Sequence, residues 1–168
     1  PEYQARPPRP PPAGLLVDAS FASMSAGLFS AVTTAMSHIA PTLPPYTEVA
    51  LIAFDDSVHF FSFSDAGLMH LVAPDHAEPC LPLPPSKLLF NLGESLDSFE
   101  EVLSTIPDLL GGTRKADTAL GSALEACTQL LDATGGRLLF FQHVMPATGN
   151  LKLQQRDDVR LCTRSPAI

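Results

Sequence analysis

The sequence predicts an α/β protein built on a mostly parallel sheet. Two short apolar runs, residues 14–19 and 48–55, have the composition of strands buried on both faces. Apolar residues at helical spacing lie between them, which indicates a crossover helix joining two parallel strands. A third run, "VHFFSF" at 58–63, follows the second after a short polar turn, which is typical of an antiparallel hairpin.

The chain enters the first strand through a proline-rich stretch, "RPPRPPPAG" at residues 6–14. Proline fixes φ and lacks a backbone donor, so the stretch is expected to be extended. We interpret it as a stiff linker, with a PxxP ligand for a small recognition domain as the alternative. Residues 1–13 are therefore predicted to be a lead-in that precedes the folded domain.

The first helix is predicted between the two buried strands. Ser23 can cap its start with its side-chain oxygen, and Pro41 stops it. The apolar positions that define this helix are Met24, Leu28, Val32, Met36 and Ile39.

The middle of the chain is the least regular part. A short strand is expected near residues 68–72. The dense prolines of "CLPLPP" at 80–85 exclude a helix and a central strand. The apolar "SKLLFNL" at 86–92 that follows is expected to be extended.

Two more helices and a fourth strand are predicted in the second half. Pro107 is expected to end one helix, Asp117 to cap the next, and "TGG" at 134–136 to close that one. "RLLFFQHV" at 137–144 then predicts a strand. The apolar faces of the helices are Leu96, Phe99, Leu103 and Ile106 for one, and Leu120, Leu124, Cys127 and Leu131 for the other.

Composition narrows the classes of function. The chain has 168 residues, 45% of them hydrophobic, a net charge of −8 and a pI of about 4.9. A single domain with a sizeable core is expected, and an acidic chain with scattered cations argues against nucleic acid as the partner. No segment approaches the roughly 18–20 apolar residues of a membrane span, and the proline-rich N-terminal stretch has no apolar signal core. A cytosolic protein, or a fragment of a longer cytosolic protein, is therefore expected.

The cysteines fit the same expectation. Cys80, Cys127 and Cys162 are odd in number and far apart, and they form no Cys-x-x-Cys pair. Reduced thiols are therefore expected, and a zinc site is not.

Small oxygen-bearing residues follow the first strand where a ligand site of an α/β sheet would lie. In von Willebrand factor A domains an Asp-x-Ser-x-Ser motif, a Thr in a Gly-Gly-Thr-like loop and an Asp after the fourth strand hold Mg²⁺. Asp18, Ser20 and Thr113 fit that pattern, but Ala22 offers no oxygen and Gln142 stands where a carboxylate is needed. We predict that the site is degenerate and holds no metal, and that Asp18 is structural, accepting nearby backbone and hydroxyl donors.

Several segments, taken together, resemble a narrower family. They include the Arg-Pro-Pro lead-in, the Phe-Asp-Ser-x-x-His-Phe hairpin and the Ala-Leu-Gly-x-Ala-Leu helix, and they extend to about residue 158. The chain is similar to the trunk domain of the cargo-adaptor subunit of the COPII vesicle coat, a degenerate von Willebrand factor A fold. These segments read "EYQARPPRPPPAGLLVDAS", "SAGLFSAV", "VALIAFDDSVHFFSF", "PCLPLPPSKLLFNLGES", "IPDLL", "TALGSALEAC" and "GGRLLFFQHVMPATGNLKLQQRDD".

The resemblance implies a three-layer, Rossmann-like α/β domain and a non-enzymatic role. Such trunks pair with the partner coat subunit as a heterodimer and help to recruit cytosolic tails of membrane cargo for export from the endoplasmic reticulum. The implied location is the cytoplasm, COPII-coated vesicles and the cytosolic face of the endoplasmic reticulum membrane, with peripheral membrane association through the coat. Arg6 matches an arginine of a signal-binding surface and could clamp a carboxylate with two hydrogen bonds.

The chain also departs from the family pattern. The resemblance implies zinc only in a cysteine-rich module that precedes the trunk, and no such module is present in these residues, so no cofactor is expected here. Residues 14–158 are predicted to be a partial trunk, incomplete at its C-terminal end, and 159–168 are an unassigned tail. The strand at 137–144 would then be an unpaired sheet edge that exposes "LLFF", and poor solubility is expected of this chain alone.

Two other classes of function fit the sequence less well. A metal-dependent ligand-binding A domain would need the oxygen ligands that Ala22 and Gln142 remove. An enzyme could use Asp18 as a phosphoryl-accepting nucleophile, but Ser20 stands where a second carboxylate is usual. "GGTRK" at 111–115 is a weak phosphate-binding pattern without the rest of a P-loop. The five histidines, His38, His59, His70, His76 and His143, are interpreted as isolated core or surface residues.

Overall fold

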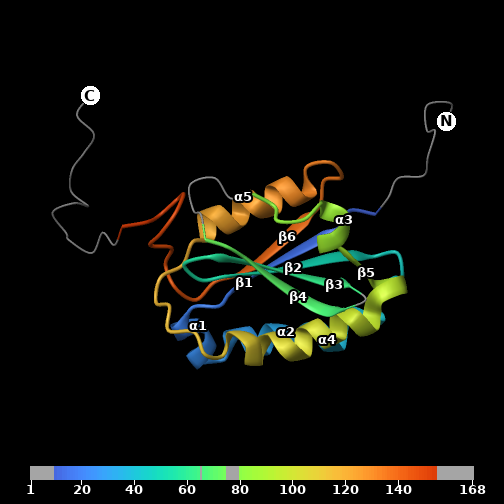
Figure 1. Cartoon of the computed structure of the whole chain (residues 1–168), viewed down its shortest axis with the longest axis horizontal. Helices are drawn as coiled ribbons and strands as arrows, with labels where there is room; N and C mark the ends of the chain where they lie inside the picture. The colour runs from blue at the N-terminus through green and yellow to red at the C-terminus, as the bar shows by residue number, and fades with distance from the viewer. Residues whose placement is uncertain (1–9, 65, 75–79, 155–168) are drawn as a thin grey trace.

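The computed structural model of the chain describes residues 10–64, 66–74 and 80–154. It forms three layers, with the sheet in the middle (Figure 1). Helix α5 and the short α3 lie on one side of the sheet, and α1, α2 and α4 lie on the other. The predicted three-layer α/β architecture is confirmed.

The sheet has six strands within the described residues, in the order β4-β3-β2-β1-β6, and β5 pairs with β2. Strand β1 pairs in parallel with β2 and with β6, whereas β3 pairs antiparallel with β2 and β4. The predicted strand near 68–72 and the predicted hairpin are thus confirmed. Strands β1, β2, β4 and β6 run in one direction, and β3 and the two-residue β5 run in the opposite one. The bounds are β1 Ala13–Asp18, β2 Glu48–Phe54, β3 Val58–Ser64, β4 Gly67–Ala73, β5 Phe90–Asn91 and β6 Arg137–Phe141.

The helix predicted between the first two strands is in fact two helices. Gly27, with φ 78°, adopts the left-handed conformation that suits glycine and separates α1 (Phe21–Ala26) from α2 (Leu28–Ile39). The predicted cap Ser23 is wrong, because the Ser20 hydroxyl caps α1 by accepting a hydrogen bond from the Ser23 N–H. A single 3₁₀ turn, Ala40–Thr42, follows α2 and contains Pro41.

Helix α4, Leu92–Leu110, does not end at Pro107 as predicted. Ile106 and Leu110 are both buried on the same face, so packing against the sheet carries the helix through the proline despite the lost backbone hydrogen bond. The helix also begins earlier than expected, where the Asn91 side chain accepts from the Gly93 N–H, and Ser95 interrupts its helical geometry.

The remaining helices correct two smaller predictions. Residues 85–88, expected to be extended, form the single helical turn α3 (Pro85–Leu88), although the following β5 is extended as predicted. Asp117 does not cap α5 (Leu120–Leu131), whose N-cap is Ala119 without a side-chain hydrogen bond.

The core has two parts, one on each face of the sheet. Leu15 and Val17 point toward α2 and α4, whereas Leu16 between them points toward α5. This alternation is why β1 is apolar at every position. Large buried side chains in the core between the sheet and helices α2 and α4 include Leu51, Phe61, Phe29, Phe99 and Ile106. Those in the core between the sheet and α5 include Leu16, Ile52, Phe54, Phe60 and Leu130.

Helix α5 packs closely on β1 at Gly14. A Cβ atom at Gly14 would lie 2.7 Å from Cys127 Sγ, so glycine permits this approach. Burial raises the pKa of the Cys127 thiol to about 12. Cys127 and the exposed Cys80 are both free thiols, as predicted, and Cys162 lies outside the described residues.

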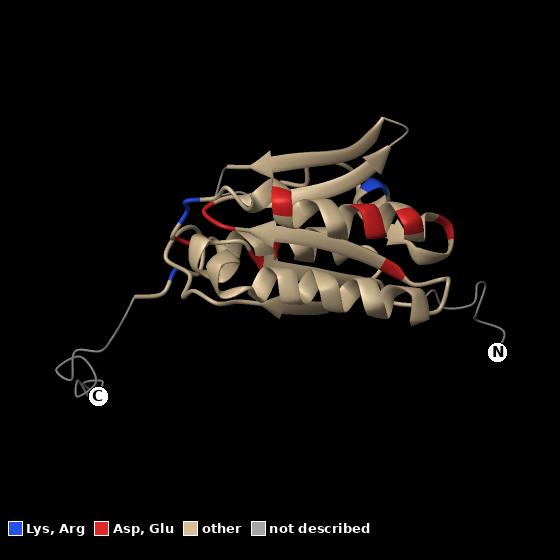
Figure 2. Ribbon diagram, turned by 90° about the horizontal axis from the view of Figure 1, so that it is seen from below, with Lys and Arg blue, Asp and Glu red and all other residues tan. Residues whose placement is uncertain are grey.

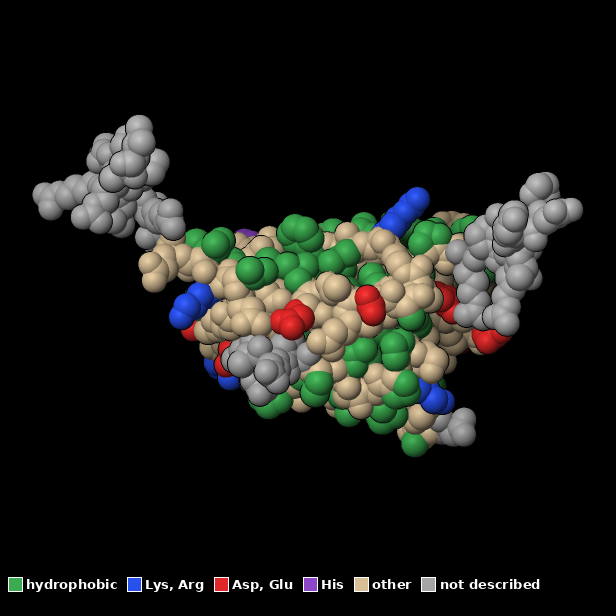
Figure 3. Space-filling view, turned by 90° about the horizontal axis from the view of Figure 1, so that it is seen from above, with side chains coloured by type: hydrophobic (Ala, Val, Ile, Leu, Met, Phe, Trp, Pro, Cys, Tyr) green, Lys and Arg blue, Asp and Glu red, His purple; other side chains and the backbone are tan. Residues whose placement is uncertain are grey.

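Strand β6 is a sheet edge within the described residues, because only β1 pairs with it. Leu139 and Phe140 are 46% and 55% exposed, as expected for this edge. Leu139 also lines an apolar cavity of about 470 Å³ with Met36 and Ile39 of α2. Apolar side chains are also visible at the surface on the side of the molecule that carries α5 (Figure 3). Whether this edge lowers solubility stays a prediction.

Candidate functional site

The loops that follow the parallel strands meet at one edge of the sheet. The Ala19 N–H donates to the Phe54 carbonyl oxygen at 2.8 Å, which joins the ends of β1 and β2. The Phe21 N–H donates to the Lys115 carbonyl oxygen at 2.7 Å, which brings in the loop at 111–119. The segments that follow β1 and β2 and the loop at 111–119 are therefore neighbours, at the edge where α/β sheets bind ligands.

Asp18 is fully buried at the end of β1, and its carboxylate is bound by backbone donors. Oδ1 accepts from the Ser20 N–H at 2.8 Å. Oδ2 accepts from the N–H groups of His143 and Val144 at 2.8 and 2.9 Å, just after β6. The carboxylate thus joins the end of β1 to the segment that follows β6, as the structural interpretation of Asp18 predicts.

The serines of the motif also serve the local backbone. Ser20 Oγ caps α1, and the Ser23 hydroxyl donates to the Asp18 carbonyl oxygen at 2.6 Å. Both serines are fully buried. Ala22, between them, contributes only a methyl group.

Thr113 lies beside Asp55, at the end of β2 rather than of β1. Its hydroxyl donates to Asp55 Oδ2 at 3.4 Å and accepts from the Lys115 N–H at 3.3 Å. Gln142 donates its side-chain amide to the Val144 carbonyl oxygen at 2.6 Å. Thr113 and Gln142 therefore also make hydrogen bonds within the protein.

These contacts do not fit a magnesium ion. Mg²⁺ requires several free oxygen ligands in near-octahedral geometry. Here three N–H groups already bind the Asp18 carboxylate, and those of His143 and Val144 come from the loop where the family pattern has a ligand. In residues 10–64, 66–74 and 80–154, no three His, Cys, Asp or Glu side chains are grouped as a metal site would need. The absence of a metal stays a prediction.

The cations of "GGTRK" are also engaged within the protein. The Lys115 ammonium forms an ion pair with the Asp56 carboxylate, and this hydrogen bond raises the pKa of Lys115. The Arg114 guanidinium lies 5.8 Å from the centre of the Phe21 ring. Figure 2 shows the Lys and Arg positions (blue) as separate short segments of the ribbon.

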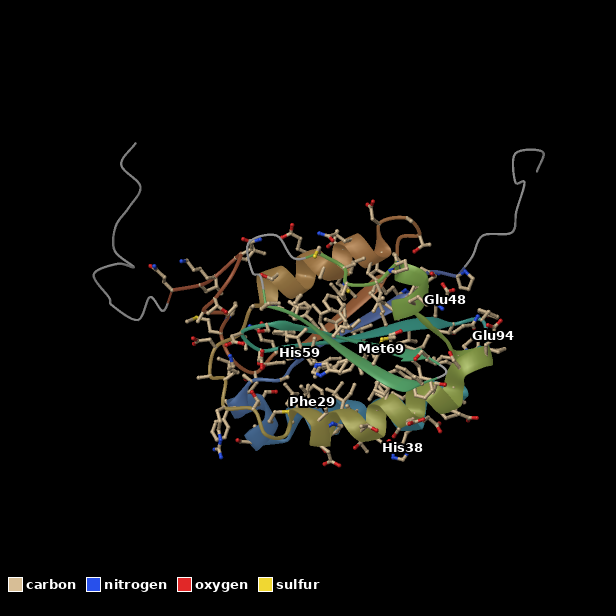
Figure 4. All side chains as sticks on the ribbon, viewed as in Figure 1. Phe29, His38, Glu48, His59, Met69 and Glu94 are labelled. Atoms are coloured by element: carbon tan, nitrogen blue, oxygen red, sulfur yellow. The ribbon has the colours of Figure 1, made fainter. Side chains whose placement is uncertain are left out.

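The interpretation of all histidines as isolated is wrong for His59 and His70. Asp55 Oδ1 lies 3.0 Å from His59 Nε2, and His59 Nδ1 lies 2.9 Å from His70 Nε2. In Figure 4, His59 lies in the interior beside the sheet, whereas His38 points outward from α2. Sequence alone carries one usable signal: Asp55 and His59 lie close together around the turn between β2 and β3, and alternation puts His59 and Phe61 on one face.

Arg6, the candidate for cargo binding, lies outside the described residues, as does His76. The role suggested for Arg6 therefore stays a prediction. The same holds for the lead-in at residues 1–9 and for the predicted domain boundary at residue 158.

Comparison with known proteins decides the family. Residues 8–165 match the family model described as the Sec23/Sec24 trunk domain. The chain belongs to this family. The resemblance seen in the sequence motifs is thereby confirmed.

The chain is similar in sequence to proteins from animals, fungi and plants. The chain is 33% identical over 162 residues to "Protein transport protein Sec24A" of Bos taurus, covering 94% of this chain and 15% of that protein. It is 33% identical over 162 residues to SEC24 of Debaryomyces hansenii, covering 94% of this chain and 17% of that one. It is 32% identical over 163 residues to SEC24 A of Arabidopsis thaliana, covering 94% and 15%. The chain thus spans about a sixth of the length of these relatives.

A solved structure supports the fold of this trunk directly. The crystal structure of the human COPII-coat protein Sec24c aligns with a TM-score of 0.82 at 25% identity, over 93% of this chain and 22% of that one. This agreement confirms the mixed α/β sheet with helices on both faces.

Proposed function

We propose that the chain is part of a COPII coat cargo adaptor and has a structural rather than an enzymatic role. The observation that carries this proposal is the trunk-family match over residues 8–165. The relatives are named as protein transport proteins, and the similar structure is of a COPII-coat protein. At the carboxyl edge, Asp18 and Ser20 are committed to hydrogen bonds with backbone N–H groups, which leaves neither as an evident nucleophile.

In this role the trunk pairs with the partner coat subunit. Exposed apolar side chains on β6 and the apolar cavity beside it support an interaction role, because isolated domains rarely leave such surface uncovered. The test is capture of the 168-residue chain on immobilised partner subunit, with a known adaptor trunk as positive control. Binding by the adaptor without binding by this chain would contradict the pairing. An Asp18→Ala variant, expected to be strongly destabilised, serves as the control for fold-dependent capture.

The proposal extends to cargo. Arg6 would clamp the carboxylate of a cytosolic cargo tail, since guanidinium and carboxylate match in two hydrogen bonds. Fluorescence anisotropy with an acidic, apolar tail peptide tests this. Arg6→Ala should weaken binding about tenfold, in line with roughly 1.5 kcal/mol for a hydrogen bond to a charged group, whereas Arg9→Ala should not. Equal effects of the two substitutions would contradict a specific site.

The corresponding location is the cytoplasm, COPII-coated vesicles and the cytosolic face of the endoplasmic reticulum membrane, with membrane contact made through the coat. In the described part of the chain, no helix is both long and apolar enough to cross a membrane. Fluorescence microscopy of the tagged chain should show punctate signal overlapping coat markers. A diffuse signal, with normal puncta for a control adaptor, would contradict this placement.

A further inference from the structure

Asp55, His59 and His70 form a continuous line of hydrogen-bonding side chains between two parts of the fold. Asp55 follows β2, His59 lies on β3 and His70 on β4. The distances are 3.0 Å from Asp55 Oδ1 to His59 Nε2 and 2.9 Å from His59 Nδ1 to His70 Nε2. The two imidazole planes differ by 21°, so each ring presents a nitrogen to the next group in the line.

The line is shielded from solvent at one end and partly open at the other. Asp55 and His59 are 5% and 7% exposed, and His70 is half-buried. The Phe61 ring lies parallel to His70, within 11°, with centroids 5.2 Å apart. Protonation can therefore reach the line from the His70 side, while Asp55 is held in a protein environment.

Few other charges surround the line. Beside Asp55 lie Asp56 and Lys115, which pair with each other. Asp18, at the end of β1, is bound by backbone N–H groups. Helix α1 has no ionisable side chain and α2 has only His38, in its last turn. Helix α4, which packs on β4, carries the acidic residues Glu94, Asp97, Glu100, Glu101 and Asp108, seen as red segments in Figure 2.

The line can take up one proton without losing a hydrogen bond. With both histidines neutral, His59 Nε2–H donates to Asp55 and His70 Nε2–H donates to His59 Nδ1. One added proton gives an imidazolium on either ring. If His70 is charged, its Nε2–H still donates to His59 Nδ1. If His59 is charged, its Nδ1–H donates to His70 Nε2, and the hydrogen of neutral His70 lies on Nδ1. In both cases the Asp55 carboxylate still accepts from His59.

A second proton cannot be accommodated in the same way. With both rings charged, His59 Nδ1 and His70 Nε2 would each carry a hydrogen at a separation of 2.9 Å. Neither nitrogen could accept, and two like charges would face each other. The pair must then separate, so the two histidines titrate as a coupled unit rather than as two independent groups.

We propose that Asp55, His59 and His70 form a proton-operated latch, which holds the β3–β4 hairpin to the carboxyl-edge loops and opens when the histidine pair takes up its second proton. The latch ends at a junction: the Asp55 carbonyl oxygen accepts from the Ala119 N–H at 2.7 Å, and its carboxylate accepts from Thr113. Opening would free β4, an outer strand of the sheet, from this junction while the two cores remain packed.

The direction of the pH effect follows from His70. Burial, and then the positive charge of His59, lower the pKa of His70 below its ordinary value of 6.5. The unfolded chain therefore binds this proton before the folded chain does. The contribution of neutral His70 to stability is complete above pH 6.5 and is lost as the pH falls from there through the lowered pKa.

Hydrogen exchange of the 168-residue chain at pH 7 and pH 5 tests the latch, after correction for intrinsic exchange rates. The β4 amides should exchange at least tenfold faster at pH 5, whereas those of β1 should not change. His70→Gln keeps a neutral hydrogen-bonding side chain and should abolish the acceleration. His38→Gln, which alters an exposed histidine, should behave as the parent chain does. The same acceleration in His70→Gln, or none in the parent, would overturn the proposal.

A second measurement covers the case in which His70→Gln fails to fold. Histidine ring NMR of the parent chain, in a Phe140→Lys background that limits association through β6, follows each ring from pH 8 to pH 4.5. The signals of His59 and His70 should change together in two steps, because they share one hydrogen bond. A change of the His70 signals in one step, with no matching change in the His59 signals, would also overturn the latch.

Discussion

Two aspartates end neighbouring parallel strands, and their partners differ in kind. Asp18, after β1, binds three backbone N–H groups. Asp55, after β2, accepts from the Ser57 N–H but also from the side chains of His59 and Thr113. Both are buried at the edge where a cation-binding domain would hold its ion. The Asp18 carboxylate is bound by backbone N–H groups, which do not titrate. The Asp55 carboxylate is bound in part by the His59 imidazole, which can gain and lose a proton.

The difference shows how two carboxylates at one edge of a sheet can have different structural roles. Backbone donors bound to Asp18 fix the end of β1 against the segment after β6, whatever the solution conditions. Side-chain donors around Asp55 make the neighbouring corner sensitive to pH. Four experiments can break or sharpen this comparison.

The largest effect is expected for Asp18→Ala. Removing the carboxylate leaves three N–H groups without their acceptor, and we expect a loss of about 3–5 kcal/mol of unfolding free energy. Urea denaturation followed by circular dichroism measures it. Asp117→Ala, at an exposed site that caps no helix, should change stability by less than about 0.5 kcal/mol. Similar losses for both substitutions would remove the special role of Asp18.

Asp55→Asn should have a smaller effect, about 2 kcal/mol, because the amide still accepts from Ser57 and only the charged acceptor for His59 is lost. Burial opposes ionisation, but the hydrogen bond and charge of His59 outweigh it and hold the pKa of Asp55 below its usual 3.8. The stability that ionised Asp55 adds to the folded state is present above pH 3.8 and is lost as the pH falls below that value. Denaturation of both chains across this range should show the difference narrowing in acid; a constant difference would contradict the ionic partnership.

Two serines allow a matched, milder test at the two corners. Ser23 is fully buried and donates to the Asp18 carbonyl oxygen at 2.6 Å, so Ser23→Ala should cost about 1–2 kcal/mol. Ser57 is half-buried and donates to Asp56 Oδ1 at 2.9 Å, so Ser57→Ala should cost less than about 0.5 kcal/mol. Thermal denaturation resolves this difference. The reverse order would mean that the corner at Asp55 is the more rigid of the two.

The smallest expected signal is for divalent cations. Calorimetric titration of the chain with Mg²⁺ or Mn²⁺ should give no binding heat, because backbone donors already bind the Asp18 carboxylate. The control is a metal-binding A domain under the same conditions. Heat that disappears in Asp18→Asn would mean that a cation displaces these donors, and the contrast between the two aspartates would fail.

Strand positions and the helix faces were predictable because buried strands and amphipathic helices leave strong local patterns. Helix boundaries were less accessible. Packing of Ile106 and Leu110 overrides the stop signal of Pro107, and Gly27 divides a run that periodicity alone presents as one helix. By residue type, Ser20 and Ser23 could each cap a helix. In the structure Ser20 caps α1, and the Ser23 hydroxyl donates to the Asp18 carbonyl oxygen instead.

The site was only partly predictable for a related reason. The sequence contains Asp18 and lacks two ligands of the pattern, so a structural role could be inferred from local motifs. The contact between His59 and His70 depends on the register of β3 against β4, which places Phe61 opposite His70. Register follows from the hairpin turn and from packing, and neither histidine carries a local signal of the other.

The close approach of α5 to β1 at Gly14 gives this chain a built-in reporter of its own opening. Cys127 lies on the face of α5 that packs on β1, it is fully buried, and its thiol is protonated at neutral pH. A thiol reagent therefore reaches it only when α5 separates from the sheet. In a Cys80→Ser, Cys162→Ser background, the rate at which a thiol reagent modifies Cys127 would report how often α5 separates from the sheet, without an engineered probe site.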